Sequence, residues 1–351
     1  MLTKRGAWDI MFVSTKARKA MARSFDTDKS NKVREIITGI YGIMPERPLH
    51  LTYENEYSDP SFAAGKATKS GTRLMLDFGD KESILRVTSV IPNRNGSHPA
   101  IINFTAEEHL PNKYLPAEEL IDRGYAIFSL CVNDVSCSNR DFRSGISNHI
   151  ARTRRKKDSA GKLTVWAWAI LRAVEYVCDL ECIDKNAITV AGHGIYARAA
   201  MLAAGFDRRV RFVIANGIAT SPLPYSSKNI KSGITVHDFP YLYSPSFAES
   251  PFGDEYSALL SHCYPRIILI GAAVDGIGLN YEDEFNYLKE ITEKCYLPAE
   301  LDGIGKVKII PTAPTQVYGG EISYHVRLGT DYFSREDWNI YLDFIDRIIA
   351  K

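Results

Sequence analysis

The chain has 351 residues, of which 45% are hydrophobic, so it can bury a substantial core and is neither disordered nor fibrous. Its 43 Lys and Arg residues nearly balance 42 Asp and Glu residues. No overall field would therefore attract it to nucleic acid or to an anionic membrane, and a small or neutral partner is expected.

The six cysteines are sparse for this length and form no CxxC pair, which argues against a disulfide framework and a zinc site. They are predicted to be reduced thiols, and no metal or cofactor is expected. The N-terminus has basic residues, but its apolar run AWDIMFV contains Asp9 and is too short for a signal-peptide core. Since no stretch is apolar enough to span a bilayer, a cytoplasmic location is predicted.

In chain order, residues 17–42 have a helical composition, and Pro45 and Pro48 would stop that helix. The alternating segments at 71–79 and 83–92 predict an antiparallel pair of strands. After them, short apolar strands alternate with helical segments: PAIINF, YAIFSLCV, AITVAG, RFVIANG, RIILIGA and KVKII. This alternation predicts a mainly parallel sheet with helices on both faces.

The last helix is predicted at 335–350, where REDWNIYLDFIDRIIA carries a broad apolar stripe. No internal repeat or low-complexity linker interrupts the chain. A single α/β domain over residues 1–351 is therefore expected, with residues 1–70 as a helical extension packed on it. The basic run at 152–158 lacks interleaved aromatic residues, so it is interpreted as a solvated loop rather than a polyanion site.

The segment NAITVAGHGIYARAAMLAAGF, residues 186–206, predicts a buried strand, a tight glycine turn and a helix. Many hydrolases carry a nucleophilic serine at such a turn. Here the turn is Gly192-His193-Gly194. The segment at 161–180 predicts the helix that precedes a strand of this kind.

The stretch from Trp166 to Asn216 resembles the central segment of the glucuronoyl esterases and related bacterial acetyl xylan esterases, of the α/β-hydrolase superfamily. Three other segments are similar to the same family: VREIITGIYGIMPERP to its N-terminal helix and turn, PRIILIGAAVDGIGLNYEDEF to its acid-bearing strand and loop, and YHVRLGTDYFSREDW to its histidine loop. The resemblance runs from about residue 33 to 340. It implies a three-layer α/β-hydrolase fold and a family acting on esters of glucuronic acid or acetylated xylan.

The family's turn resembles G-C-S-R-x-G-K. Against GHGIYAR, this pattern places Gly194 at the serine, Ile195 at the arginine and Arg198 at the lysine. The histidine loop, similar to Y-H-x-R-P-G-x-H-D, places Asp331 at the general base. The resemblance thus implies that nucleophile and base are lost, while Asp275 matches the acid. A serine at such a turn has a strained backbone, which Gly194 would relax.

The leading hypothesis is a catalytically degenerate member that binds a small carboxylate or a carbohydrate. Arg198 is expected either to contact the anion or to stabilise local packing, and the backbone N–H of Ile195 to survive as an oxyanion donor. One alternative is a carboxylic-ester hydrolase that uses His193, expected if this side chain faces the crevice. Another is an interaction protein on a hydrolase scaffold, which predicts a filled crevice and a large apolar patch. The oligomeric state stays open.

Other candidate chemistry is weaker. Asp275, Asp331 and Glu336 have no predicted separation that would define a glycosidase or metal site, and Glu336 is expected in the first turn of the last helix. His325 matches a family histidine distinct from the catalytic one. GAAVDGIG lacks the GxGxxG spacing of a dinucleotide loop. Three tryptophans at helical spacings are expected in the core or at interfaces rather than as sugar platforms: Trp166, Trp168 and Trp338.

Overall fold

The computed structural model describes residues 27–151, 155–218, 235–276, 280–305 and 312–350. The described strands are β1 (His50–Asp59), β2 (Ala67–Asp77), β3 (Glu82–Pro92), β4 (His98–Thr105), β5 (Ala126–Cys131), β6 (Ile183–His193), β7 (Val210–Asn216), β8 (Ile267–Asp275), β9 (Thr315–Tyr318) and β10 (Ile322–Thr330). They form one ten-stranded sheet in the order β1-β2-β3-β5-β4-β6-β7-β8-β10-β9.

The sheet is antiparallel at its first edge and parallel in its centre. Strands β1, β2, β3 and β5 pair antiparallel, whereas β5, β4, β6, β7, β8 and β10 pair parallel. Strand β9 adds an antiparallel edge beside β10. The predicted α/β class, mainly parallel with an antiparallel N-terminal part, is confirmed.

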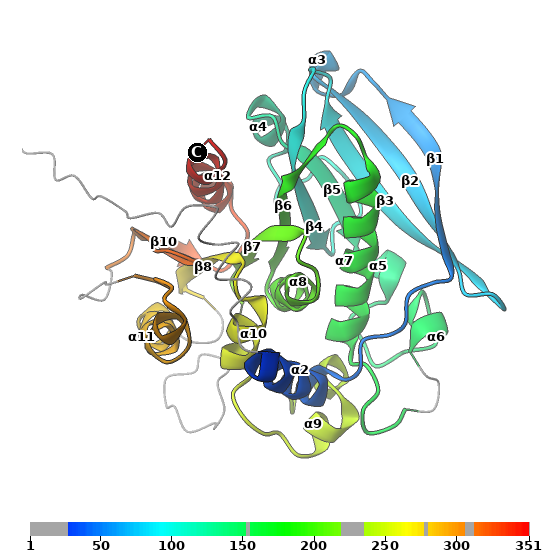
Figure 1. Ribbon diagram of the computed structural model, residues 1–351. Coiled ribbons are helices and arrows are strands. Elements are labelled where there is room, and N and C mark those ends of the chain that lie inside the picture. Colours follow the sequence, from blue (N-terminus) through cyan, green and yellow to red (C-terminus); the bar gives the residue numbers. More distant parts are fainter. Residues whose placement is uncertain (1–26, 152–154, 219–234, 277–279, 306–311, 351) are drawn as a thin grey trace, which may run out of the picture.

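The larger described helices are α2 (Thr27–Tyr41), α4 (Ala117–Asp122), α7 (Lys162–Asp179), α8 (Ile195–Phe206), α10 (Glu255–Cys263), α11 (Tyr281–Ile291) and α12 (Arg335–Ile349). Short helices are α3 (Phe62–Gly65), α5 (Val132–Val135), α6 (Ser147–Ile150) and α9 (Pro245–Glu249). Helices α7, α8 and α10 cover one face of the sheet, and α4 and α12 the other (Figure 1). None of these described helices has the length and apolar character that a membrane span requires.

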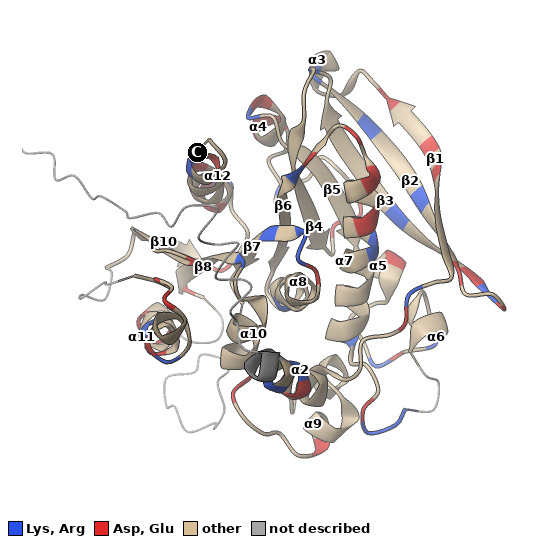
Figure 2. Cartoon of the chain, in the orientation of Figure 1, with Lys and Arg blue, Asp and Glu red and all other residues tan. Residues whose placement is uncertain are grey.

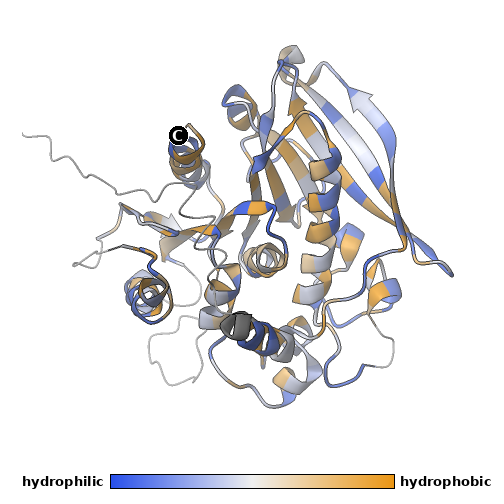
Figure 3. Cartoon of the chain, viewed as in Figure 1, coloured by the Kyte–Doolittle hydropathy of each residue, from blue (hydrophilic) through white to orange (hydrophobic). Residues whose placement is uncertain are grey.

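Two apolar cores lie on the two faces of the sheet. The larger core contains nearly all of α7, including the fully buried Trp166 and Trp168. The smaller one is built around Trp338 of α12. Figure 3 shows the apolar residues concentrated on the central strands, whereas charged residues of both signs are interspersed on β1, β2 and the helices (Figure 2). The three tryptophans are core residues, as predicted.

The helical extension predicted for residues 1–70 is wrong in its second half. Within the described part of that range, α2 is helical but β1 and the start of β2 belong to the main sheet. Strand β1 was missed because HLTYENEYSD is mostly polar and exposed, and its alternation of Leu51, Tyr53 and Tyr57 is interrupted by Asn55. Its pairing with β2 shifts register between Asn55 and Tyr57.

The segment around His325, expected as a loop, begins as the buried strand β10. The predicted strand KVKII at 306–310 and the first part of the helix predicted at 17–42 lie outside the described residues. Residues 155–158 of the basic run lie in a loop, as expected.

Candidate functional site

The strand, turn and helix predicted for residues 186–206 are present. Strand β6 ends at His193, α8 begins at Ile195, and Gly194 between them has φ 61° and ψ −126°. Only glycine adopts such a backbone without a cost. An ideal Cβ on Gly194 would approach just one heavy atom within 4 Å, the Gly217 carbonyl oxygen at 3.9 Å. The turn therefore has the shape and the room for a side chain, but glycine supplies none.

The side chain of His193 is held at the end of β6. Its Nδ1 lies 2.9 Å from Asn216 Oδ1, and Asn216 Nδ2 donates to the Tyr341 hydroxyl at 3.0 Å. With the amide in this orientation, Nδ1 carries the proton and donates to Asn216. The ring also stacks against Phe333, with centroids 6.3 Å apart. Since 33% of the side chain is exposed, His193 faces outward above the strand ends.

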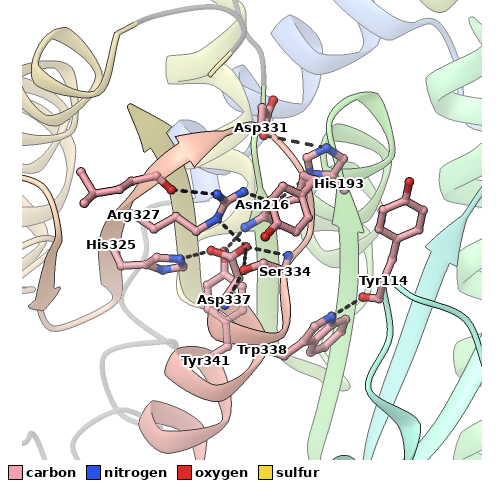
Figure 4. Close-up of polar contacts among 12 residues, drawn as sticks. Tyr114, His193, Asn216, His325, Arg327, Asp331, Ser334, Asp337, Trp338 and Tyr341 are labelled. Carbon is pink, nitrogen blue, oxygen red and sulfur yellow. Dashed lines mark hydrogen bonds and ion pairs between the residues drawn. The ribbon is translucent and has the colours of Figure 1, made fainter. Parts of the chain in front are cut away.

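Asp331 comes to the same place from the loop after β10. Its Oδ1 lies 3.8 Å from His193 Nε2, and the two side chains face each other beyond the ends of the strands (Figure 4). Gly217, with φ 53°, makes this approach possible. A Cβ there would clash with Asp331 Oδ1 and lie 2.8 Å from His193 Cε1.

The chemistry of this pair follows from the hydrogen bond of His193. Because Nδ1 donates to Asn216, Nε2 keeps the lone pair of the neutral ring, and at 3.8 Å from Asp331 Oδ1 it makes no hydrogen bond there and can accept a proton. At 3.8 Å, the Nε2–Oδ1 contact is an ion pair only when the ring is protonated. The backbone N–H of Ile195 lies in the first turn of α8, where N–H groups have no intrahelical acceptor. Its role as an oxyanion donor stays a prediction.

Asp275, the predicted acid position, is exposed at the end of β8, where it pairs in register with Thr330. Within the described residues no hydrogen bond or ion pair joins its carboxylate to Asp331 or His193. The structure therefore brings Asp331, at the base position, close to His193. It leaves Asp275, at the acid position, apart from both.

Arg198 is not an exposed anion contact, because its side chain is completely buried. Its Nη1 donates to the Tyr243 hydroxyl at 2.8 Å and lies 3.5 Å from Glu255 Oε1, and its Nε donates to the Ile218 carbonyl at 3.1 Å. Burial lowers the pKa of Arg198, but Tyr243 and Glu255 outweigh that effect and raise it. The expectation of a ligand contact is wrong, and the packing role considered beside it is the one observed.

A buried network that the sequence did not predict supports the Asp331 loop. Asp337, at the start of α12, accepts from His325 Nε2 at 2.7 Å and from Arg327 Nε at 3.1 Å. Arg327 Nη2 in turn donates to the Tyr332 carbonyl at 2.6 Å. His325 is thus a structural residue, distinct from the base position. Glu336 is exposed in the first turn of α12, as predicted.

Glu284 of α11 is a second group that sequence reasoning missed. It is buried and accepts from the hydroxyls of Tyr256 and Tyr324, each at 3.2 Å. Burial, with a smaller contribution from the Asp331 carboxylate, raises its pKa to about 7 against the lowering effect of the two tyrosines. A lone glutamate in an acidic helix start gave no signal of this in the sequence.

A mainly parallel sheet covered on both faces, with a glycine turn between a central strand and its following helix, defines an α/β-hydrolase fold. A family model described as "Glucuronyl esterase, fungi" matches residues 76–221. Carbohydrate esterase MZ0003, from an unknown prokaryotic organism, is 23% identical over 241 residues, which cover 65% of this chain and 55% of that protein. The chain thus spans little more than half of this curated relative.

Two solved structures have the same fold. A glucuronoyl esterase from Solibacter usitatus matches with a TM-score of 0.80 at 19% identity, over 93% of each chain. A promiscuous CE15 esterase from a marine bacterial metagenome matches with a TM-score of 0.76 at 17% identity, over 95% of this chain and 93% of its own. The resemblance to glucuronoyl esterases that the sequence predicted is therefore confirmed.

Proposed function

We propose that this chain is a catalytically degenerate relative of the glucuronoyl esterases that binds a small carboxylate or carbohydrate without hydrolysing it. In this proposal Gly194 holds the nucleophile position, Asp331 the base position and Asp275 the acid position.

The observation that carries the proposal is the backbone of Gly194. Its φ of 61° and ψ of −126°, between a buried strand and a helix, suit the strained serine of a hydrolase turn, yet the residue has no hydroxyl. Acyl transfer needs a nucleophile and a base within hydrogen-bond reach of each other. Gly194 cannot attack, so a base at this turn, such as Nε2 of His193, has no side-chain nucleophile to activate.

The proposed ligand follows from the names of the relatives and from the groups that remain. The relatives are named as glucuronoyl and carbohydrate esterases, and His193 is partly exposed beside the first turn of α8. A carboxylate or sugar hydroxyl at this turn would accept from the backbone N–H of Ile195. The predicted cytoplasmic location stays a prediction.

The test is hydrolysis of p-nitrophenyl acetate and a benzyl glucuronate ester by the purified protein and by a Gly194→Ser, Asp331→His double variant. We expect no turnover above buffer for the wild type and a measurable gain for the double variant. The matched control, Gly194→Ala with Asp331→His, has the same base but no hydroxyl and should stay inactive. Turnover by the wild type would contradict the proposal.

A second candidate is a carboxylic-ester hydrolase that uses His193, and the contact between His193 and Asp331 favours it. In this candidate Asn216 holds Nδ1, and Nε2 of His193 acts on the substrate as a nucleophile or as a base for water. Wild-type hydrolysis that disappears in His193→Ala and persists in Gly194→Ala would select this candidate.

A further inference from the structure

A charged cavity of about 500 Å³ lies between β1, the last turns of α7 and the turn from α8 to β7. Six of its lining residues are ionic: Arg47, Glu175, Asp179, Asp207, Arg208 and Arg209. Because β6 and β7 are parallel, the turn before Val210 lies at the opposite edge of the sheet from Gly194. The cavity is therefore separate from the turn at Gly194, and nothing in the proposed function uses it.

The three carboxylates of the cavity already hold donors. Glu175 Oε1 accepts from Arg172 at 2.9 Å and lies 3.2 Å from Arg47. Both oxygens of Asp207 accept from Arg209 over distances of 2.6–3.1 Å. Asp179 accepts from the Tyr53 hydroxyl at 2.7 Å. The acidic groups are thus committed to protein partners.

The arginines, in contrast, keep donors to spare. The Arg47 side chain is 71% exposed and reaches Glu175 through Nη2 alone. Arg209 uses Nε and Nη2 on Asp207, which leaves Nη1. Arg208 is exposed and has no hydrogen bond or ion pair among the described residues. A guanidinium offers five N–H donors and no acceptor. The donors of this cavity that have no protein partner can therefore bind a negatively charged acceptor.

A fourth guanidinium, that of Arg172, shares Glu175 with Arg47. Arg172 is 2% exposed, and its Nη1 has no hydrogen-bond partner in the described part of the chain. Burial lowers its pKa, and the positive charges of Arg47 and Arg209 lower it further against the effect of Glu175. Four guanidiniums therefore surround three carboxylates, and an added anion would relieve their mutual repulsion.

The rest of the wall is apolar or aromatic, formed by Leu51, Tyr53 and Phe206. A bare phosphate or carboxylate would leave this wall and much of the volume empty. We propose that the cavity binds a small organic anion, with its carboxylate or phosphate on Arg47 and Arg208 and an apolar body against Tyr53 and Phe206.

The experiment is calorimetric titration of the full chain at low ionic strength with phenyl phosphate and phenylacetate, beside inorganic phosphate and neutral benzyl alcohol. We expect one of the two aromatic anions to bind, which identifies the anionic group, and both comparison compounds to bind more weakly. In Arg47→Gln with Arg208→Gln the affinity should fall about tenfold or more, because each lost hydrogen bond involves a charged group. The exposed Arg335→Gln on α12 is the matched control and should bind as the wild type does.

The proposal is overturned if neither aromatic anion binds, if benzyl alcohol binds as well as they do, or if the double variant binds unchanged. Equal binding of inorganic phosphate would overturn the role of the apolar wall. Thermal unfolding of each variant establishes that it folds. Arg208→Gln alone removes no contact among the described residues, so it keeps the test valid if the double variant is unstable.

Discussion

The backbone of Gly194 is the residue on which the proposed loss of activity depends. Because a Cβ would meet almost nothing there, Gly194→Ala should lower the free energy of unfolding only through backbone strain, by about 1–3 kcal/mol. Gly217→Ala should cost more, since its Cβ also clashes with Asp331 and approaches His193. Urea denaturation of both variants tests this order, and an equal or smaller loss for Gly217→Ala would show that the loop yields.

Sequence patterns identified Gly194, His193 and Asp331 as candidate site residues, because each is a fixed number of residues from a recognisable motif. They could not decide where Arg198 points. Its partners Tyr243 and Glu255 lie 45 and 57 residues away in sequence, so the buried ion pair depends on packing that no local pattern records. Asn216 was missed as the partner of His193 for the same reason.

Among the elements, α12 begins with a capping box that also holds the site loop. Ser334 Oγ accepts from the backbone N–H of Asp337. In return, Asp337 Oδ2 accepts from the backbone N–H and from the hydroxyl of Ser334. Although burial would raise the pKa of Asp337, the hydrogen bonds from His325 and Ser334 hold it below its usual value. This carboxylate is therefore ionised in the folded protein.

We expect Ser334→Ala to lower the free energy of unfolding by about 1 kcal/mol, the usual cost of a lost cap. Asp337→Ala should cost about 3–5 kcal/mol, because it also leaves Arg327 buried without its ionic partner. Chemical denaturation measures both. If the two variants lose equal stability, the contacts of Asp337 to β10 contribute little.

Helix α11 carries a buried acid whose effect depends on pH. The pKa of Glu284 is about 7 in the folded protein, against 4.5 for an ordinary glutamate. Between these values the folded chain binds more protons than the unfolded one, so this group makes stability fall as pH rises from 4.5 to 7. The glutamine in Glu284→Gln cannot ionise. As pH rises from 4.5 to 7, the free energy of unfolding of this variant should therefore rise by roughly 3 kcal/mol relative to the wild type. Urea midpoints from pH 4.5 to 8 that run parallel for both proteins would contradict this.

Strands could be predicted from the sequence where both of their faces are buried. Strands β4 to β8 are continuous apolar runs because helices cover both faces, and α7 and α12 have clear helical periodicity. Strand β1 was hard to predict, because it is largely exposed and its alternation of Leu51, Tyr53 and Tyr57 is interrupted by Asn55. Strand β10 was predicted as a loop because of its resemblance to a histidine loop, although its first six residues are buried as in a covered strand.

In the whole molecule, the turn at Gly194 and the charged cavity lie at opposite ends of the parallel strands. They share no hydrogen-bond partner among the described residues. We therefore expect Gly194→Ser with Asp331→His to leave the affinity of the cavity for its aromatic anion unchanged. Combining this pair with Arg208→Gln should give additive changes in stability, within about 0.5 kcal/mol. A larger coupling would mean that the central strands transmit strain between the two ends.

Strand β1 has a consequence for the protein in concentrated solution. It is the edge of the sheet, and among the described residues no strand pairs with its outer side, so another chain can add a strand there. Glu54 and Glu56 lie on this edge, paired with Arg73, and the register shift at Asn55 and Tyr57 bends it. With a net charge of only +1, repulsion between whole molecules is weak. Among the described residues, these charges and this irregularity are the features of the edge that oppose edge-to-edge aggregation.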